Sequence, residues 1–77
     1  MRLEHWFVVD DCESIGGNVY GHPRFEDAEL VITSEIRDII ESAATGDLYL
    51  ITKNNVYELG RASTPDELTK LRKLYNV

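Results

Sequence analysis

Two apolar segments on either side of an asparagine pair constrain the fold of this chain more than any other feature. Residues 48–53 and 56–60 flank Asn54 and Asn55. Asparagine tolerates positive φ, so this pattern predicts a β-hairpin with a two-residue type I′ loop. In that register Lys53 faces Val56, and one side of the hairpin carries large apolar side chains that we expect in the core. These are Leu48, Leu50, Tyr57 and Leu59, with Thr52 opposite Tyr57 and Leu50 opposite Leu59.

Three further segments are typical of strands. Residues 3–9 are rich in Trp, Phe and Val, which favour extended backbone. A second strand over residues 18–22 is expected to begin after Gly16 and Gly17. It ends at Pro23, because proline cannot donate a ladder hydrogen bond. A third strand begins at Leu30.

The continuation of the third strand over residues 34–43 has two interpretations. Its β-branched content and its β-rich surroundings favour a long, bent strand running to about Glu41, which is our prediction. A helix is the alternative, because Ser34 is a suitable N-cap and four side chains share one helical face: Ile36, Ile39, Ile40 and Ala43.

The last segment predicts a helix. Thr64 is a suitable N-cap, Pro65 fits the first helical position, and Glu67 completes a capping box. Asp66 and Lys70 have the i,i+4 spacing of an ion pair. One apolar stripe is expected to pack on the sheet or on a partner: Leu68, Leu71 and Tyr75, with Leu74 beside them.

These segments predict a single mainly β (α+β) domain over residues 1–77. We expect a small curled antiparallel sheet or a partly open five-stranded barrel over residues 1–62, followed by one C-terminal helix over residues 63–77. At 77 residues the hydrophobic core is thin, so we also expect a homo-oligomer. Four aromatic side chains are expected in the core or at an interface: Trp6, Phe7, Tyr49 and Tyr57.

The charge of the chain narrows the classes of partner. There are 14 Asp and Glu against 8 Lys and Arg, a net charge of −6. An acidic surface repels phosphate backbones, so we expect no general nucleic-acid binding and instead an attraction to basic protein surfaces. The single cysteine, Cys12, allows no internal disulfide. No apolar run is long enough for a membrane span, and none resembles a signal peptide, so the expected location is a bacterial or infected-cell cytoplasm.

Candidate ligand-binding residues gather around residues 17–25. Tyr20 and His22 are expected on the same face of the second strand, and Arg24 follows where the chain turns. With the hydroxyls of Thr33 and Ser34 on the next strand, these groups can cradle a phosphate or carboxylate, because arginine and histidine donate and an aromatic ring stacks. The alternative interpretation is a strand-end network in which His22 and Ser34 satisfy backbone groups.

Catalysis and metal binding are not predicted, and no cofactor is expected. Ser34 with His5 or His22 lacks a nucleophile elbow and a third orienting group. No Cys or His spacing fits zinc. An acidic turn lacks the glycine and the ligand spacing of a calcium loop, so we expect it to be solvated: Asp10, Asp11 and Glu13.

Several of these segments form a pattern across most of residues 3–60. The pattern has Trp6 in the first strand, then GNVYGHPRF over residues 17–25, then Thr33-Ser34, then VYELG over residues 56–60. It resembles a group of short proteins of bacteria and their phages, which implies a phage or mobile-element origin without implying an activity. The group usually has Asp-Gly after the phenylalanine, whereas this chain has Asp27-Ala28. Alanine disfavours positive φ, which places a glycine-dependent turn there in question.

Together these features predict a non-catalytic binding protein of phage or mobile-element type. Our first hypothesis is a stoichiometric inhibitor that blocks a basic surface of a host defence protein through acidic residues such as Glu35, Asp38 and Glu41. The alternatives are a protein that sequesters a small anionic or nucleotide-like ligand, and a structural assembly module. The ligand would bind in a pocket made by Tyr20, His22, Arg24, Thr33 and Ser34.

Overall fold

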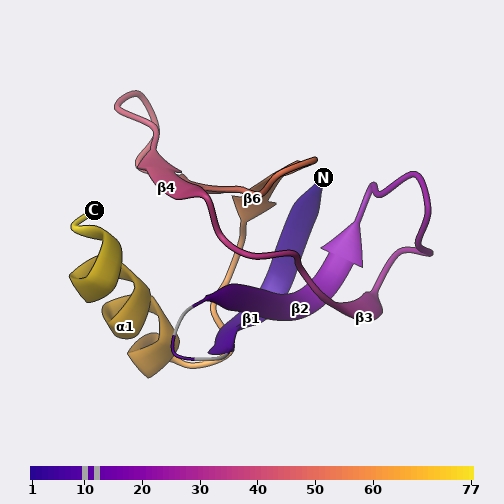
Figure 1. Cartoon of the computed structure of the whole chain (residues 1–77), viewed down its shortest axis with the longest axis horizontal. Helices are drawn as coiled ribbons and strands as arrows, with labels where there is room; N and C mark the ends of the chain where they lie inside the picture. Colours follow the sequence, from indigo (N-terminus) through magenta and orange to yellow (C-terminus); the bar gives the residue numbers. More distant parts are fainter. Residues whose placement is uncertain (10, 12) are drawn as a thin grey trace.

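Six strands and one helix make up the protein in the computed structural model, which describes residues 1–9, 11 and 13–77 (Figure 1). The mainly β fold with one C-terminal helix is confirmed. The strands are β1 (Arg2–Val9), β2 (Ser14–Tyr20), β3 (Glu29–Ile32), β4 (Asp38–Glu41), β5 (Leu48–Ile51) and β6 (Val56–Leu59), and the helix is α1 (Pro65–Tyr75).

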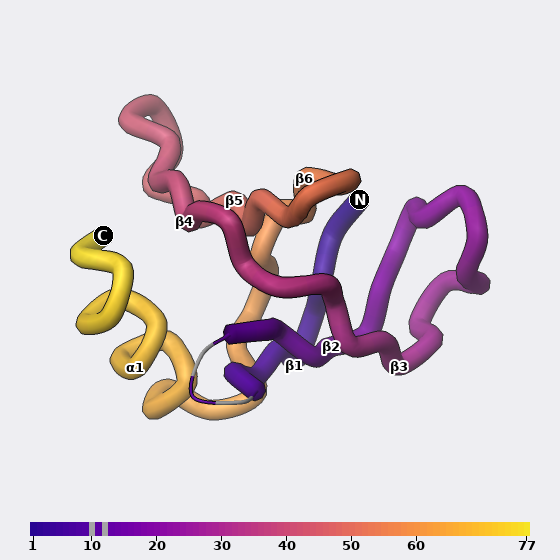
Figure 2. The backbone as a smooth tube through the Cα atoms, in the orientation of Figure 1, coloured from indigo at the N-terminus to yellow at the C-terminus, as the bar shows by residue number. Residues whose placement is uncertain are grey.

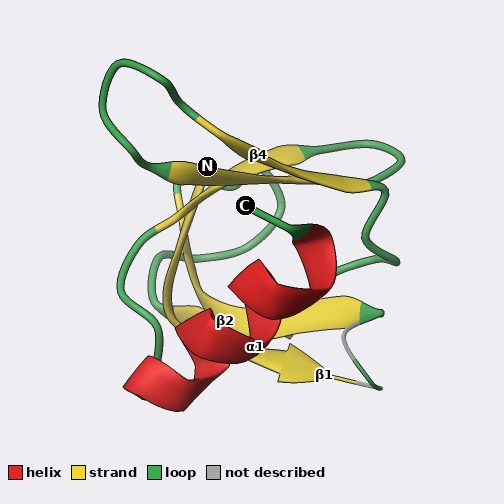
Figure 3. Cartoon of the chain, turned by 90° about the vertical axis from the view of Figure 1, so that its left-hand side faces the viewer, coloured by secondary structure: helices red, strands yellow, loops and turns green. Residues whose placement is uncertain are grey.

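All six strands belong to one strongly curled sheet. Its order is β3-β2-β1-β6-β5-β4. Neighbours are antiparallel except at the centre, where β1 and β6 run parallel, so the sheet is mixed rather than wholly antiparallel. Figure 3 shows β4 with its neighbours above and β1 with β2 below, with α1 in front of the open side. The sheet is not a closed barrel, because its two edges are the separate strands β3 and β4.

The predicted third strand is divided into β3 and β4, which raises the strand count from five to six. The linker 33–37 carries the chain from one edge of the sheet to the other (Figure 2). The N–H of Ile36 donates to Glu13 O at 2.8 Å, and the N–H of Arg37 donates to Ile51 O at 2.7 Å, so this linker joins the two halves. A single long strand was wrong, because residues on either side of the linker pair at opposite edges. The helical alternative is also wrong for these residues.

A backbone irregularity in β1 explains why its apolar residues alternate poorly. The register with β2 shifts between Glu4 and Phe7, and His5 has a φ of 51°. The shift turns both Leu3 and Trp6 into the core, where they are 0% and 1% exposed. Trp6 belongs there to one buried cluster, against which Val31 of β3 also packs. The other members are Leu3, Ile15, Val19, Ile36, Ile39, Leu48, Leu50, Tyr57, Leu59 and Leu71.

Strand β2 begins earlier than expected and contains its two glycines instead of following them. A Cβ on Gly16 would lie 2.5 Å from Phe7 Cζ and 2.8 Å from Ile32 Cδ1. The side chains of Phe7 and Ile32 therefore cover Gly16 on the outer face of the sheet. The glycine lets a ring from β1 approach an aliphatic chain from β3 across the strand between them.

The β5–β6 hairpin has the predicted core face but a different register. Leu50 pairs with Tyr57 and Ile51 pairs with Val56, which is a shift of two residues from the prediction. Neither Asn54 nor Asn55 has positive φ. A four-residue loop replaces the two-residue one, because the Asn55 N–H donates to the hydroxyl of Thr52 at 3.2 Å. A two-residue shift keeps each side chain on its face, so the core face is confirmed: Leu48, Leu50, Tyr57 and Leu59 are all buried.

The helix α1 begins and is oriented as predicted, but its first turn is bonded differently. Thr64 is the N-cap residue and its side chain makes no cap hydrogen bond. Glu67 Oε2 instead accepts the backbone N–H of Val8 at 3.1 Å, so the expected capping box is replaced by a tie to β1. Lys70 pairs with Glu67 at 3.7 Å rather than with Asp66. Leu71 is fully buried and Leu68 and Tyr75 pack against the core, whereas Leu74 stays 60% exposed.

The turn before β3 holds an alanine in a conformation that favours glycine. Ala28 has a φ of 72°. Its N–H donates to Val19 O at 2.8 Å and its carbonyl accepts from Asn18 Nδ2 at 3.1 Å, while Asp27 Oδ1 accepts the Gly21 N–H at 2.9 Å. These bonds stabilise the turn even though the left-handed region disfavours a residue with a Cβ.

Replacing this alanine with glycine should therefore stabilise the protein. Relief of the left-handed strain, less the greater freedom of glycine in the unfolded chain, is expected to raise the free energy of unfolding by about 0.5–1 kcal/mol for Ala28→Gly. Thermal unfolding should show a midpoint a few degrees higher. Ala44→Gly is the control, because Ala44 lies in an exposed turn without positive φ. An equal gain in both variants would contradict strain at Ala28.

Candidate functional site

A hollow of about 500 Å³ brings together four of the five predicted ligand-binding residues, namely His22, Arg24, Thr33 and Ser34. They come from the loop after β2 and from the start of the linker 33–37. We call it the His22–Tyr57 hollow, and its full lining is His22, Pro23, Arg24, Phe25, Val31, Ile32, Thr33, Ser34, Asn54, Asn55 and Tyr57.

The imidazole of His22 lies close to two aromatic rings. Its centroid lies 4.7 Å from that of Phe25 at an interplanar angle of 53° and 6.3 Å from that of Tyr57 at 22°. Its Nδ1 accepts the backbone N–H of Arg24 at 3.0 Å. A ring nitrogen that accepts a hydrogen bond carries no proton, so the neutral ring carries its proton on Nε2 and has one donor left.

The tyrosine that lines the hollow is Tyr57 and not the predicted Tyr20. Tyr57 is 5% exposed, and its hydroxyl accepts from Asn55 Nδ2 at 3.4 Å. The β5–β6 loop supplies Asn54 and Asn55 to the same wall. Sequence reasoning missed these three residues because it assigned them to a hairpin turn and a core face. The β5–β6 loop is far from His22 in the sequence, and the curl of the sheet brings the two together.

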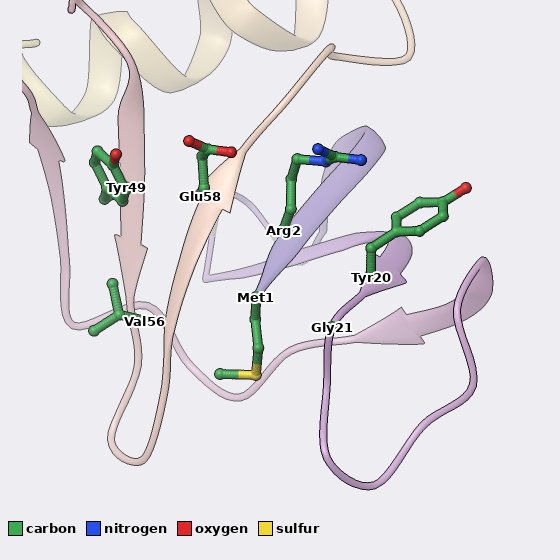
Figure 4. A pocket seen from close by; sticks show the side chains of 7 residues that line it. All are labelled: Met1, Arg2, Tyr20, Gly21, Tyr49, Val56 and Glu58. Carbon is green, nitrogen blue, oxygen red and sulfur yellow. The ribbon is translucent and has the colours of Figure 1, made fainter.

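Tyr20 lies in a different place from the other candidates. Gly21 has a φ of 74° and ends β2, so His22 does not continue the strand and does not share a face with Tyr20. The Arg2 guanidinium lies 5.4 Å from the Tyr20 ring centroid. Tyr20 instead lines a second hollow, of about 420 Å³. Figure 4 shows it there with Met1, Arg2, Gly21, Tyr49, Val56 and Glu58.

The charge of the His22–Tyr57 hollow is opposite to that of the whole chain. Of the described residues, no Asp or Glu lines it, and Arg24 is the cation in its wall. Among the described residues the ion pairs are Lys70–Glu67 and Arg72–Glu41. The described residues therefore contain no ion-pair partner for the guanidinium of Arg24, and its N–H donors are available to a ligand.

The two hydroxyls at the start of the linker have different roles. Thr33 is 7% exposed, and its Oγ1 accepts the N–H of Ile15 at 3.1 Å while its own N–H donates to Ile15 O at 2.8 Å. The Thr33 side chain is therefore part of the structure that joins the linker to β2. Ser34 is exposed, and its hydroxyl makes no hydrogen bond within residues 1–9, 11 and 13–77.

The three predicted protein-interaction carboxylates do not form one surface. Glu35 and Asp38 are exposed, and Asp38 Oδ1 accepts the N–H of Ile39 at 2.8 Å. Glu41 pairs with Arg72 of α1 at 3.2 Å. Asp38 and Glu41 are three residues apart on β4, so alternation points them to opposite faces. Glu41 contributes to docking of the helix.

The residues considered for metal binding and for nucleophilic catalysis do not gather into a site among the described residues. Within the described residues no three His, Cys, Asp or Glu side chains gather where they can hold a metal ion. Asp10 and Cys12 lie outside the described residues. His5 is exposed in the β1 irregularity and Ser34 lies in the hollow beyond β3.

Because Tyr57 is buried, we expect the free energy of unfolding to fall at alkaline pH, and we expect a single substitution to reduce this fall. Desolvation raises the pKa of Tyr57 above its ordinary value of 10.0, against a smaller lowering by the Asn55 hydrogen bond. Above pH 10 the unfolded chain loses this proton while the folded chain keeps it, so the free energy of unfolding falls as pH rises toward the folded pKa. Tyr57→Phe should show a smaller fall in urea midpoint between neutral pH and pH above 10. Tyr49→Phe, outside the hollow, is the control, and an equal fall in the parent and Tyr57→Phe would contradict this cause.

Comparison with protein-family models, with curated proteins and with solved structures finds no match for this chain. Within the described residues no helix has the length and apolar character required to cross a lipid bilayer. The class of site therefore rests on its own chemistry. As far as residues 1–9, 11 and 13–77 show, it is a small polar hollow with an aromatic wall, one guanidinium outside any ion pair and no carboxylate.

Proposed function

We propose that this protein is a non-catalytic binding protein that sequesters a small anionic, nucleotide-like ligand in the His22–Tyr57 hollow. The observation that carries the proposal is the placement of Arg24, with no ion pair among the described residues, in a hollow without carboxylates on a chain of net charge −6. A local cation on an acidic chain is favourable for one compact anion, whereas an extended polyanion meets repulsion from the rest of the surface.

Each part of the hollow matches one part of such a ligand. The guanidinium of Arg24 offers a fork of donors to a phosphate or carboxylate. The Ser34 hydroxyl and His22 Nε2 add single donors, since His22 Nδ1 is already engaged. The rings of Phe25 and His22, tilted by 53°, offer faces and edges on which a planar group can stack. Asn54 and Asn55 supply amide groups for polar ring edges.

Calorimetric titration with AMP, adenosine and inorganic phosphate tests this proposal. AMP should bind more tightly than either of its parts, because it alone uses both the cation and the aromatic wall. Arg24→Ala removes a charge-assisted interaction and should weaken AMP binding roughly 10–100-fold. Arg61→Ala, an exposed arginine outside the hollow, should leave it unchanged. Absence of binding by all three probes, or equal AMP affinity in the parent and Arg24→Ala, would overturn the proposal.

Blockade of a basic host protein by a protein of phage or mobile-element type is the second candidate function that we propose. It is favoured by the net charge of −6 and by Glu35 and Asp38, which are exposed and outside both ion pairs. Capture of one host partner should weaken with salt and with joint reversal to lysine at Glu35 and Asp38. Glu41 is left unchanged because its reversal would disturb α1. Reversal of Glu26 and Asp47 is the matched control, and equal capture by both double variants would contradict this candidate.

A further inference from the structure

Strand β3 is an edge strand of the sheet, and no other described strand pairs with its free edge. Its side chains on the outer face of the sheet are apolar. It lies at the edge of the sheet, far from α1 in the view of Figure 1. Leu30 is 63% exposed and Ile32 is 56% exposed. Ile32 continues inward to Phe7 over Gly16, so the exposed side chains extend a packed apolar row. Exposed apolar edges of this kind pair readily with another strand.

The orientation of the backbone N–H and C=O groups in β3 shows which kind of partner can pair with its free edge. Thr33 donates its N–H to Ile15 O, and Val31 lies opposite Gly17, so the odd-numbered residues face β2. Because N–H and C=O groups alternate along an antiparallel strand, those of Leu30 and Ile32 point to the free edge. An extended strand satisfies both residues at once, which a compact ligand does not.

We propose that this edge pairs with β3 of a second copy of the chain, antiparallel about a two-fold axis at Val31. In this register Leu30 lies opposite the partner's Ile32, and Ile32 lies opposite the partner's Leu30. Both pairs are hydrogen-bonded, because all four residues direct their N–H and C=O groups outward. The side chains of these residues then form one apolar cluster on the outer face. The two sheets become continuous, and the interface is isologous.

The charges of the strand fit a second copy. Glu29 is the charged residue of β3, and in the two-fold register it lies opposite the partner's Thr33 and not opposite another carboxylate. Each whole copy carries a net charge of −6, so the two copies repel each other at long range. Salt screens that repulsion. The dimer should therefore become tighter as salt rises, whereas binding of a basic partner would become weaker.

Sedimentation analysis over a range of protein and salt concentrations tests the proposal. The parent should approach twice the 8.8 kDa of one chain, at lower protein concentration in high salt. Leu30→Lys with Ile32→Lys should stay monomeric, because it places four ammonium groups in the apolar cluster. Leu74→Lys changes a side chain that is 60% exposed on α1 and should dimerise like the parent.

Amide hydrogen exchange of the parent adds a measurement that needs no variant. The N–H groups of Leu30 and Ile32 should exchange more slowly as protein concentration rises. A parent that remains monomeric in high salt would overturn the proposal, as would a dimer in the double variant or a monomer in Leu74→Lys. A monomer whose β3 instead captures an unrelated extended peptide would also overturn it. None of these results depends on AMP binding, so this proposal and the ligand proposal can fail separately.

Discussion

Trp6→Ala should leave the protein largely unfolded or close to it at room temperature. Trp6 is 1% exposed, and removal of a buried tryptophan side chain costs about 3–5 kcal/mol. A domain of this length has a total stability of roughly 4–12 kcal/mol. Trp6 also connects elements, because its Nε1 donates to Gly60 O at 3.0 Å and its backbone oxygen accepts from Ser63 at 2.8 Å. Far-UV circular dichroism in urea should show a large loss in midpoint.

Two comparisons separate the volume of Trp6 from its hydrogen bond. Trp6→Phe keeps most of the aromatic packing but leaves Gly60 O without the indole donor, so its loss should be smaller than that of Trp6→Ala. Leu74→Ala removes an exposed apolar side chain and should change the midpoint little. Circular dichroism is the required probe, because Trp6 is the single tryptophan. A midpoint for Trp6→Ala near that of Leu74→Ala would show that Trp6 does not stabilise the core as described.

Thr33→Val should destabilise the protein even though valine matches the shape of threonine. The Thr33 hydroxyl accepts the N–H of Ile15, which is 0% exposed. Valine leaves that donor without a partner, at a cost of about 1–3 kcal/mol. The substitution also weakens the junction at which the linker 33–37 leaves β3 for the other edge of the sheet. Urea unfolding followed by Trp6 fluorescence measures the loss.

Thr33→Ser is the control for this prediction, because serine keeps the hydroxyl and removes a methyl group. It should recover most of the stability lost in Thr33→Val. If valine is tolerated and serine is not, the methyl group matters and the hydrogen bond to Ile15 does not. In either case Thr33 stabilises the wall of the hollow and is not itself the main ligand donor, which distinguishes it from Ser34.

The hairpin shows how far side-chain pattern predicts structure. Its core face was correct because alternation depends only on the parity of the residue number, and a two-residue shift preserves parity. Its register was wrong because loop closure depends on the hydroxyl of Thr52, which bonds to Asn55 three residues later. At the helix start the competing bond is long-range instead, because Glu67 accepts the backbone N–H of Val8 in β1 rather than that of its own cap.

The candidate site was partly predictable for a similar reason. His22 and Arg24 are two residues apart, and a short-range bond from Arg24 to His22 Nδ1 fixes them together. Ser34 reaches them because β3 pairs with β2. Tyr20 was wrongly grouped with them because the positive φ of Gly21 turns the chain away from the strand. Tyr57 was missed because its distance in sequence from His22 hides a ring contact.

The sequence by itself determined the mainly β class, the buried side of each hairpin strand and the helix with its buried Leu71. These features follow from local periodicity and from backbone preferences of single residues. Only the tertiary structure decided that β3 and β4 occupy opposite edges and that β1 pairs in parallel with β6. It also decided that the β5–β6 loop completes the His22–Tyr57 hollow. The physical reason is that strand order and sheet curl are set by the packing of all strands around Trp6 and its neighbours, which is a property of the whole core.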